Sequence, residues 1–115
     1  MRYGRMFETG SIVLIPFPFS DLKSSKKRPI LMRTVPDSNG DFIALAVTSK
    51  GYHPGAVELT AECLQFGTLP CQSWIRTEKV FTLAQSLIVK IAGKVKGEII
   101  EQAITGLCDS LGDKQ

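Results

Sequence analysis

The sequence predicts a small β-barrel that is closed by one C-terminal helix. Short apolar stretches alternate with polar turns along most of the chain, which is typical of strands. The last apolar residues instead recur at helical spacing. No repeat, low-complexity tract or linker divides the 115 residues, and 43% of them are hydrophobic. We therefore expect one domain, residues 1–115, around a single core.

The first predicted strand, residues 11–19, reads "SIVLIPFPF" and is apolar on both faces. One face carries Val13, Ile15, Phe17 and Phe19, and the other carries Ile12 and Leu14. A strand that is apolar on both faces is central in its sheet or lies under a partner. Pro16 and Pro18 cannot donate ladder hydrogen bonds, so we expect the second half to bend away or follow an edge.

Two further strands complete a predicted antiparallel meander. Residues 29–35 begin with Pro29, which is tolerated at a first strand position because that residue need not donate. Residues 36–41, "PDSNGD", form a turn around Asn39-Gly40. Residues 42–49 form the third strand.

The second half of the chain is less regular. Residues 56–60 predict a short strand, and residues 61–72 are irregular or weakly stranded. Residues 73–83 mix strand-forming residues with charges, so their structure is ambiguous. Residues 89–95 alternate and fit a last strand.

The C-terminal segment predicts an amphipathic helix. Its apolar face consists of Ile100, Ala103, Ile104, Leu107 and Leu111. Glu98 and Glu101 lie in the first turn, where the helix dipole favours acids. Gly106 weakens the helix by about 1 kcal/mol relative to alanine.

Charge is unevenly distributed and excludes several classes of protein. Residues 1–33 hold seven cations and two acids, a net charge of +5, whereas the remainder carries −2. This asymmetry indicates a local anion-binding face and excludes a chromatin-type protein that is basic throughout. Cys63, Cys71 and Cys108 are an odd, loosely spaced set, and His53 is the only histidine. A disulfide framework and a zinc site are therefore not expected. Without an apolar signal core or spanning run, we expect a soluble cytoplasmic protein.

The stretch "KKRPILM" carries the strongest candidate site. Pro29 restricts the backbone of Arg28, and a rigid guanidinium suits bidentate phosphate binding. If the two strands pair through the turn at 36–41, residues 28–29 approach Thr48 and Ser49. For the cations, a solvated hairpin loop is an equally plausible interpretation. For Thr48 alone, plain β-propensity is the more common one.

Several other residues are candidates to bind a nucleic acid. The preceding loop would attract phosphates, and its members are Lys23, Ser24, Ser25, Lys26 and Lys27. Lys50, Arg76 and Lys79 extend a basic track or are simply exposed. Trp74 and Phe81 would stack on bases or pack in the core. His53 fits a solvated surface histidine better than a catalytic one. No phosphate-binding glycine loop, nucleophile elbow or paired carboxylates are present.

Taken together, "GSIVLIPFPFSDLKSSKKRPILM", "ALAVTS" and "SWIRTEKVFTL" resemble the MazF/PemK family of toxin endoribonucleases over residues 9–111. The shared features are a Gly-x-Ile-Val strand, a basic-Arg-Pro step, a strand ending in Thr-Ser and a Trp-x-Arg-Thr segment. Ser11 stands where the family commonly has an acid, and "PFPFSD" replaces an aspartate-bearing segment.

The resemblance implies an SH3-like β-barrel, as in MazF/PemK and CcdB-like toxins, that forms a homodimer. It implies cleavage of single-stranded RNA without metal or other cofactor, by attack of the ribose 2′-OH, and neutralisation by a cognate antitoxin. The family's catalytic arginine and threonine fall on Arg28 and Thr48, with a mobile substrate-covering loop before Arg28.

The residue inventory is compatible with this chemistry. A two-histidine mechanism is excluded because only His53 exists, and a two-metal mechanism lacks its carboxylates. What remains is electrostatic stabilisation, with Arg28 at the phosphorane and Thr48 on the phosphate or 2′-OH. The alternative is a non-catalytic module of the same fold that binds nucleic acid or a protein target such as a topoisomerase.

Overall fold

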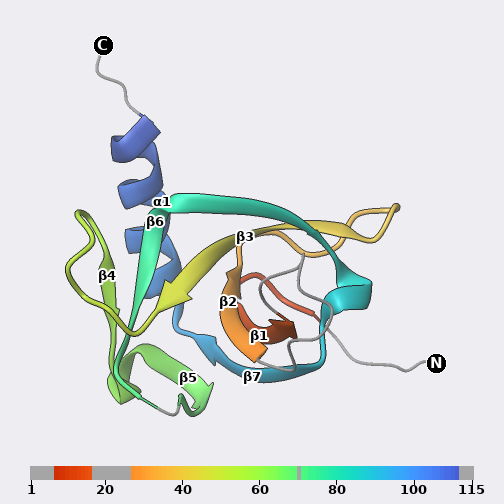
Figure 1. Ribbon diagram of the computed structural model, residues 1–115, viewed down its shortest axis with the longest axis horizontal. Coiled ribbons are helices and arrows are strands. Elements are labelled where there is room, and N and C mark those ends of the chain that lie inside the picture. Colours follow the sequence, from red (N-terminus) through yellow and green to blue (C-terminus); the bar gives the residue numbers. More distant parts are fainter. Residues whose placement is uncertain (1–6, 17–26, 70, 112–115) are drawn as a thin grey trace.

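Seven strands curl into a nearly closed barrel in the computed structural model, which describes residues 7–16, 27–69 and 71–111 (Figure 1). The strands are β1 Ser11–Pro16, β2 Lys27–Met32, β3 Asp41–Thr48, β4 Val57–Leu59, β5 Leu64–Gly67, β6 Ser73–Ala84 and β7 Lys90–Val95. Their order in the sheet is β4-β6-β3-β2-β1-β7-β5. Two 3₁₀ turns, Ala61–Cys63 and Gln85–Leu87, and one helix, α1 Gly97–Leu111, complete the described elements. The predicted fold class is confirmed.

Strand β1 lies in the centre of the sheet, as its two apolar faces predict. It pairs antiparallel with β2 on one side and with β7 on the other. Ile12 packs into one hydrophobic core, whereas Val13 and Ile15 pack into a second core on the opposite face. The strand ends at Pro16. The rest of the predicted strand, with Pro18, falls outside the described residues.

The predicted meander and its turn are confirmed, but the limits of β2 differ. The Asp37 carboxylate accepts the N–H groups of Asn39 and Asp41, and Gly40 adopts a φ of +84°. β2 begins at Lys27, so Pro29 is its third residue instead of its first. The missing N–H is tolerated there because β2 pairs with β3 only from Ile30 onward. β2 also ends at Met32, three residues before the predicted end.

The ambiguous segment forms the longest strand of the sheet. β6 spans 12 residues and pairs with β3 along its length and with β4 at its first residues. Ser73, Ile75 and Thr77 alternate as buried residues, while Trp74 and Arg76 between them are only partly buried. Pairing of β6 with β3 and β4 therefore makes this segment a strand, although its mixed sequence gives only a weak local preference for one.

Two cores lie on the two faces of the curved sheet. The first is covered by α1 and includes Ile12, Leu31, Leu45, Val47, Leu59, Ile75, Val95, Ile99 and Ala103. The second fills the barrel and includes Val13, Ile15, Ile30, Met32, Phe42, Ala44 and Leu83. Both faces of β1 are thus buried within one chain. The apolar residues on both faces of this strand are therefore used inside the monomer.

Helix α1 packs on the first core, and its buried face includes Ile99, which the predicted apolar face did not contain. Ile99 and Ala103 are buried, with Ile100 and Leu107 partly buried beside them. Gly106 lies against β6: a Cβ there would come within 2.8 Å of the Thr77 Cγ2. Within the described residues, no helix combines the length and apolar character that crossing a membrane requires.

Candidate active site

A pocket of about 240 Å³ opens where β2 and β3 diverge, and we call it the β2–β3 pocket. Its lining residues are Ile15, Arg28, Pro29, Ile30, Ala46, Val47, Thr48, Arg76, Lys79 and Phe81. The β2–β3 pairing starts at Ile30 and Ala46. Because Pro29 brings no N–H to continue that ladder, the two strands separate at this point, and the pocket occupies the gap.

Strand alternation aims Arg28 into the pocket. Ile30 pairs with Ala46, so continuing the same register by two residues places Arg28 opposite Thr48. Side chains two residues apart share one face of a strand, so Arg28 follows Ile30 onto the barrel side of the sheet. The second core ends here with Ile15 and Ile30, and both residues line the pocket. The pocket is therefore the polar end of the barrel interior.

The Thr48 hydroxyl is held in a defined position. Its Oγ1 accepts the backbone N–H of Lys50 at 3.1 Å, which leaves the hydroxyl hydrogen to be donated. Thr48 is partly buried, whereas Ser49 and Lys50 are exposed and lie outside the pocket lining. Of these three residues, only Thr48 lines the pocket. The backbone N–H of Lys50 acts indirectly, because it holds the Thr48 hydroxyl in place.

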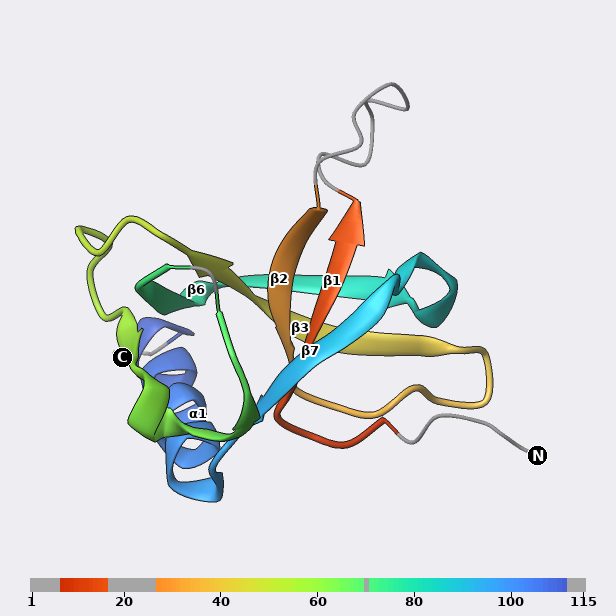
Figure 2. The same ribbon diagram turned by 90° about the horizontal axis from the view of Figure 1, so that it is seen from below.

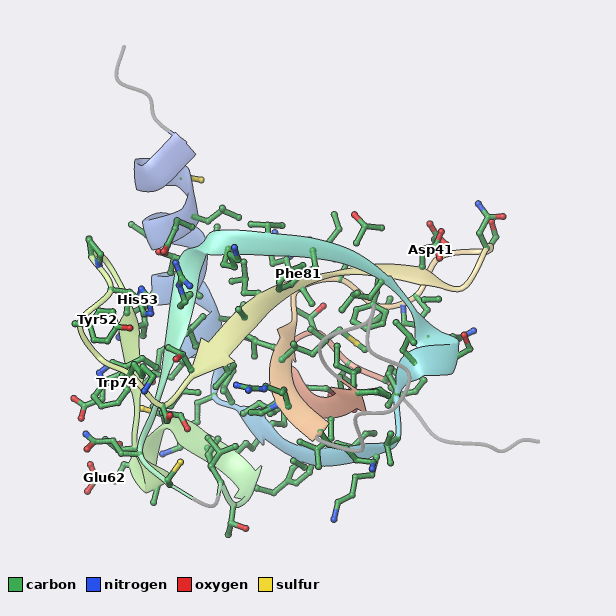
Figure 3. All side chains as sticks on the ribbon, in the orientation of Figure 1. Asp41, Tyr52, His53, Glu62, Trp74 and Phe81 are labelled. Atoms are coloured by element: carbon green, nitrogen blue, oxygen red, sulfur yellow. The ribbon has the colours of Figure 1, made fainter. Side chains whose placement is uncertain are left out.

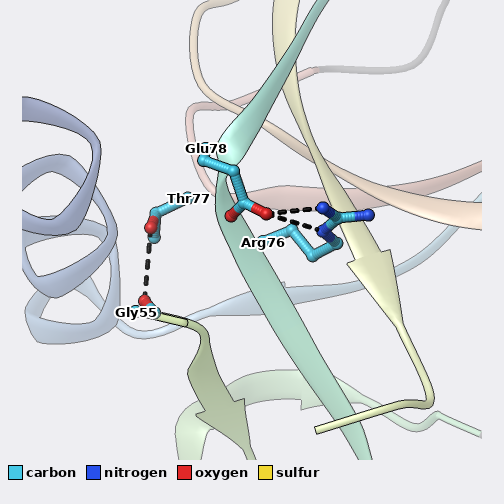
Figure 4. Close-up of polar contacts among 4 residues, drawn as sticks. All are labelled: Gly55, Arg76, Thr77 and Glu78. Atoms are coloured by element: carbon cyan, nitrogen blue, oxygen red, sulfur yellow. Dashed lines mark hydrogen bonds and ion pairs between the residues drawn. The ribbon is translucent and has the colours of Figure 1, made fainter. Parts of the chain in front are cut away.

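A wide bulge in β6 brings two more cations to the pocket. Leu45 pairs with Val80, but its neighbour Ala46 pairs with Arg76, so three residues of β6 have no partner on β3. The first of them, Thr77, is buried and donates its hydroxyl to the Gly55 carbonyl oxygen at 3.2 Å (Figure 4). Bulges redirect side chains, and here Arg76 and Lys79 both line the pocket.

Glu78, also in the bulge, holds the Arg76 guanidinium (Figure 4). Arg76 donates to the Glu78 Oε2 from Nη2 at 2.5 Å and from Nε at 3.1 Å. This hydrogen bond from Arg76 keeps the pKa of the Glu78 carboxyl below its ordinary value of 4.5, despite the opposing effect of desolvation. Glu78 is consequently ionised at neutral pH, and it is linked to the pocket through Arg76, which lines it.

Trp74 lies apart from the pocket. It pairs with Thr48, two residues before Arg76, but its ring packs under Gly51, where a Cβ would be 2.6 Å from the ring. Figure 3 shows Trp74 beside the loop that carries Tyr52 and His53 and far from Phe81. The rings of Tyr52 and His53 contact each other in a tilted arrangement, with centroids 4.5 Å apart. Trp74 thus supports the loop after β3 from beneath.

The predicted site residues therefore divide into three groups. Arg28, Pro29, Thr48 and Arg76 meet in the β2–β3 pocket. Lys27, Ser49, Lys50 and Trp74 lie outside its lining, and Lys27 lines a different pocket. Lys23, Ser24, Ser25 and Lys26 fall outside the described residues.

Sequence reasoning missed Glu78 and gave Lys79 and Phe81 little weight. One signal for Glu78 was available: in a strand, the i, i+2 spacing of Arg76 and Glu78 places an acid and a base on one face. No such signal existed for Lys79, because the strand pattern alone does not reveal a bulge. Among residues 7–16, 27–69 and 71–111, no three His, Cys, Asp or Glu side chains gather into a metal site. The pocket instead suits an anion.

Comparison with known proteins gives one family and one fold. The profile of PemK-like, MazF-like toxins of type II toxin–antitoxin systems matches residues 8–111. A search of curated proteins finds no significant match.

Three solved structures illustrate the similarity of fold. MazF from Deinococcus radiodurans has 19% sequence identity and a TM-score of 0.73, with 96% of this chain and 100% of that chain covered. An endoribonuclease from a mycobacterial species has 16% identity and a TM-score of 0.69, with 96% of each chain covered. A mycobacterial endoribonuclease in complex with its cognate antitoxin has 17% identity and a TM-score of 0.66, with 93% and 94% covered.

Proposed function

Since the chain belongs to the PemK-like, MazF-like toxins of type II toxin–antitoxin systems, we propose that it is an endoribonuclease that cleaves single-stranded RNA. The observation that carries the proposal is the convergence of Arg28, Thr48, Arg76 and Lys79 on one pocket. Three cations and a hydroxyl donor around one small hollow suit a phosphodiester whose charge increases in the transition state.

The proposed reaction is an internal transesterification that needs no metal. The ribose 2′-oxygen attacks the adjacent phosphorus, its proton passes to a base, and the P–O5′ bond breaks as the leaving oxygen gains a proton. The products are a 2′,3′-cyclic phosphate and a 5′-OH. Arg28 stabilises the phosphorane, and Thr48 donates a hydrogen bond to the phosphate.

The bulge supplies the two groups that would move protons. Glu78 is ionised and is paired with a pocket-lining side chain, so we assign it as the acceptor of the 2′-OH proton. The Lys79 ammonium carries donor hydrogens and is assigned to protonate the leaving oxygen. Arg76 remains charged throughout and is held by Glu78 at the side of the phosphate.

Incubation of the purified protein with mixed single-stranded RNA in excess EDTA tests the proposal. We expect fragments that end in 2′,3′-cyclic phosphate, and their loss in the Arg28→Ala variant. Intact RNA, together with a salt-dependent mobility shift, would instead indicate a non-catalytic RNA-binding module. Cleavage that stops in EDTA would contradict the metal-free mechanism.

The family also supports proposals about partners. We expect a cognate antitoxin to neutralise the toxin in the cytoplasm by covering the basic pocket. A homodimer is supported by an apolar patch beyond the cover of α1, in which Val35, Ile43 and Val80 are 47%, 39% and 43% exposed. Sedimentation at micromolar concentration should give twice the monomer mass.

A further inference from the structure

A second pocket, of about 430 Å³, lies beside the same end of β2, and we call it the β1–β7 groove. Its apolar lining comes from Leu14, Pro29, Leu69, Ile91 and Ala92. Its polar lining comes from Lys27, Thr68 and Lys90. The two lysines are exposed, so their ammonium groups are accessible from solvent.

The groove and the β2–β3 pocket lie on opposite faces of one strand end. Because side chains alternate along β2, Arg28 enters the β2–β3 pocket and Lys27 enters the groove. Leu14 pairs with both Pro29 and Lys90, so the groove crosses β2, β1 and β7. Figure 2 shows the ends of β1 and β2 projecting beyond the rest of the barrel. Pro29 lines both the β2–β3 pocket and the β1–β7 groove. An RNA strand that passes around this end of β2 would therefore reach both sites.

The chemistry of the groove suits one nucleotide. No acid lines it. In the part of the chain that the structure describes, no carboxylate forms an ion pair with Lys90, whereas Lys94 on the same strand is paired with Glu8. Two ammonium groups above an apolar floor match a phosphate next to a base or ribose.

We propose that the β1–β7 groove is a second RNA subsite, which binds the phosphate and base of a nucleotide outside the cleaved step. The proposal rests on the proposed RNA-cleaving function. It explains why adjacent cations of β2 are divided between two faces: Arg28 contacts the reacting phosphate, and Lys27 with Lys90 holds the flanking strand.

Binding of uncleavable RNA by Lys90→Ala tests the subsite without depending on catalysis. Two fully 2′-O-methylated RNAs are compared by fluorescence anisotropy: a short one that comprises only the two nucleotides of the cleaved step, and a long one that is extended at both ends. We expect Lys90→Ala to bind the long RNA about fivefold more weakly at 0.1 M salt, with a log–log salt slope shallower by about 0.7, as for one lost phosphate contact on a single strand. Its affinity for the short RNA should not change.

Lys96→Ala is the matched control, because Lys96 is exposed just after β7 and lines neither pocket. It should match wild type on both RNAs, and Lys90→Arg should retain long-RNA affinity. Wild-type affinity of Lys90→Ala for the long RNA, or equal weakening on both RNAs, would overturn the subsite.

Unmodified RNA separates the two hypotheses. If the subsite is correct, Lys90→Ala should raise KM for the long RNA and leave kcat unchanged. If wild type binds both methylated RNAs but leaves unmodified RNA intact, the cleavage function fails while the binding result still decides the subsite.

Discussion

The two faces of the sheet differ in how they are closed: one is sealed by α1, and the other opens at a charged pocket. On one face, α1 covers the first core, and close contacts complete the seal: Gly106 lies against Thr77, and a Cβ at Gly10 would come within 2.6 Å of Ile100 Cδ1. On the other face, the second core ends at the β2–β3 pocket, where Pro29 interrupts a ladder and a bulge interrupts β6. The helix and small residues close one face, and the two interruptions beside β3 open the other to charged groups.

The comparison teaches where chemistry can be placed in a small barrel. A continuous ladder satisfies backbone groups and fixes alternate side chains, so it leaves little room for a charged site. The ladder is interrupted on both sides of β3, at Pro29 of β2 and at the bulge of β6. At these two places, side chains no longer follow the regular alternation of the sheet. Activity should therefore depend on the open end of the second face, and stability on the buried residues of the two cores.

The largest expected effect is on activity at the open face. Glu78→Gln removes the proposed base and the charge that holds Arg76, so kcat should fall by about 10²–10⁴. Because Arg76 lowers the pKa of Glu78 below 4.5, the carboxylate is present throughout the neutral range and is lost only as the pH falls below that value. The wild-type rate should accordingly show no acid limb from this group between about pH 5 and 8, measured with a fluorogenic RNA at constant ionic strength.

Glu78→Asp keeps the charge and is the matched control, since it should retain more activity than Glu78→Gln. Equal rates for Glu78→Gln and wild type would remove this residue from the mechanism.

A pair of substitutions separates the faces directly. Arg28→Ala should lower cleavage by about 10²–10³ through loss of one transition-state contact, with the free energy of unfolding changed by less than about 0.5 kcal/mol because the residue is exposed. Leu45→Ala, in the fully buried first core, should cost about 2–5 kcal/mol of stability. Urea unfolding and initial rates on the same samples measure both quantities. A large loss of stability in Arg28→Ala would contradict the division between the faces.

The smallest expected effect tests the seal under α1. Gly106→Ala gains about 1 kcal/mol of helix propensity, but its Cβ would lie 2.8 Å from Thr77 Cγ2. Thr77 is buried and stiff, so overpacking of about 1–3 kcal/mol should outweigh the gain and lower the unfolding midpoint in urea. Gly97→Ala is the matched control, because no atom lies within 4 Å of its added Cβ. Addition of Thr77→Ser should reverse the loss, and a stabilised Gly106→Ala would show that the contact relaxes freely.

Local patterns in the sequence determined the central strand, the meander and the placement of its residues. The two apolar faces of β1 predict burial on both sides, and the Asn39-Gly40 turn predicts a β2–β3 register that brings Arg28 and Thr48 to one pocket. Alternation and turn length act between neighbours along the chain, so they can be read without knowing the rest of the fold.

Only the tertiary structure decided the features that depend on distant partners. The β6 bulge exists relative to β3, and it alone reveals that Arg76 and Lys79 line one pocket while Glu78 pairs with Arg76. Gly106 looks like a weak point of the helix until Thr77 is seen against it. Alternation along β2 places Lys27 and Arg28 on opposite faces, but only the packing of β7 shows that Lys27 lines a groove, because Lys90, Ile91 and Ala92 form part of its wall. Each feature depends on segments brought together by folding, which no local pattern of the sequence encodes.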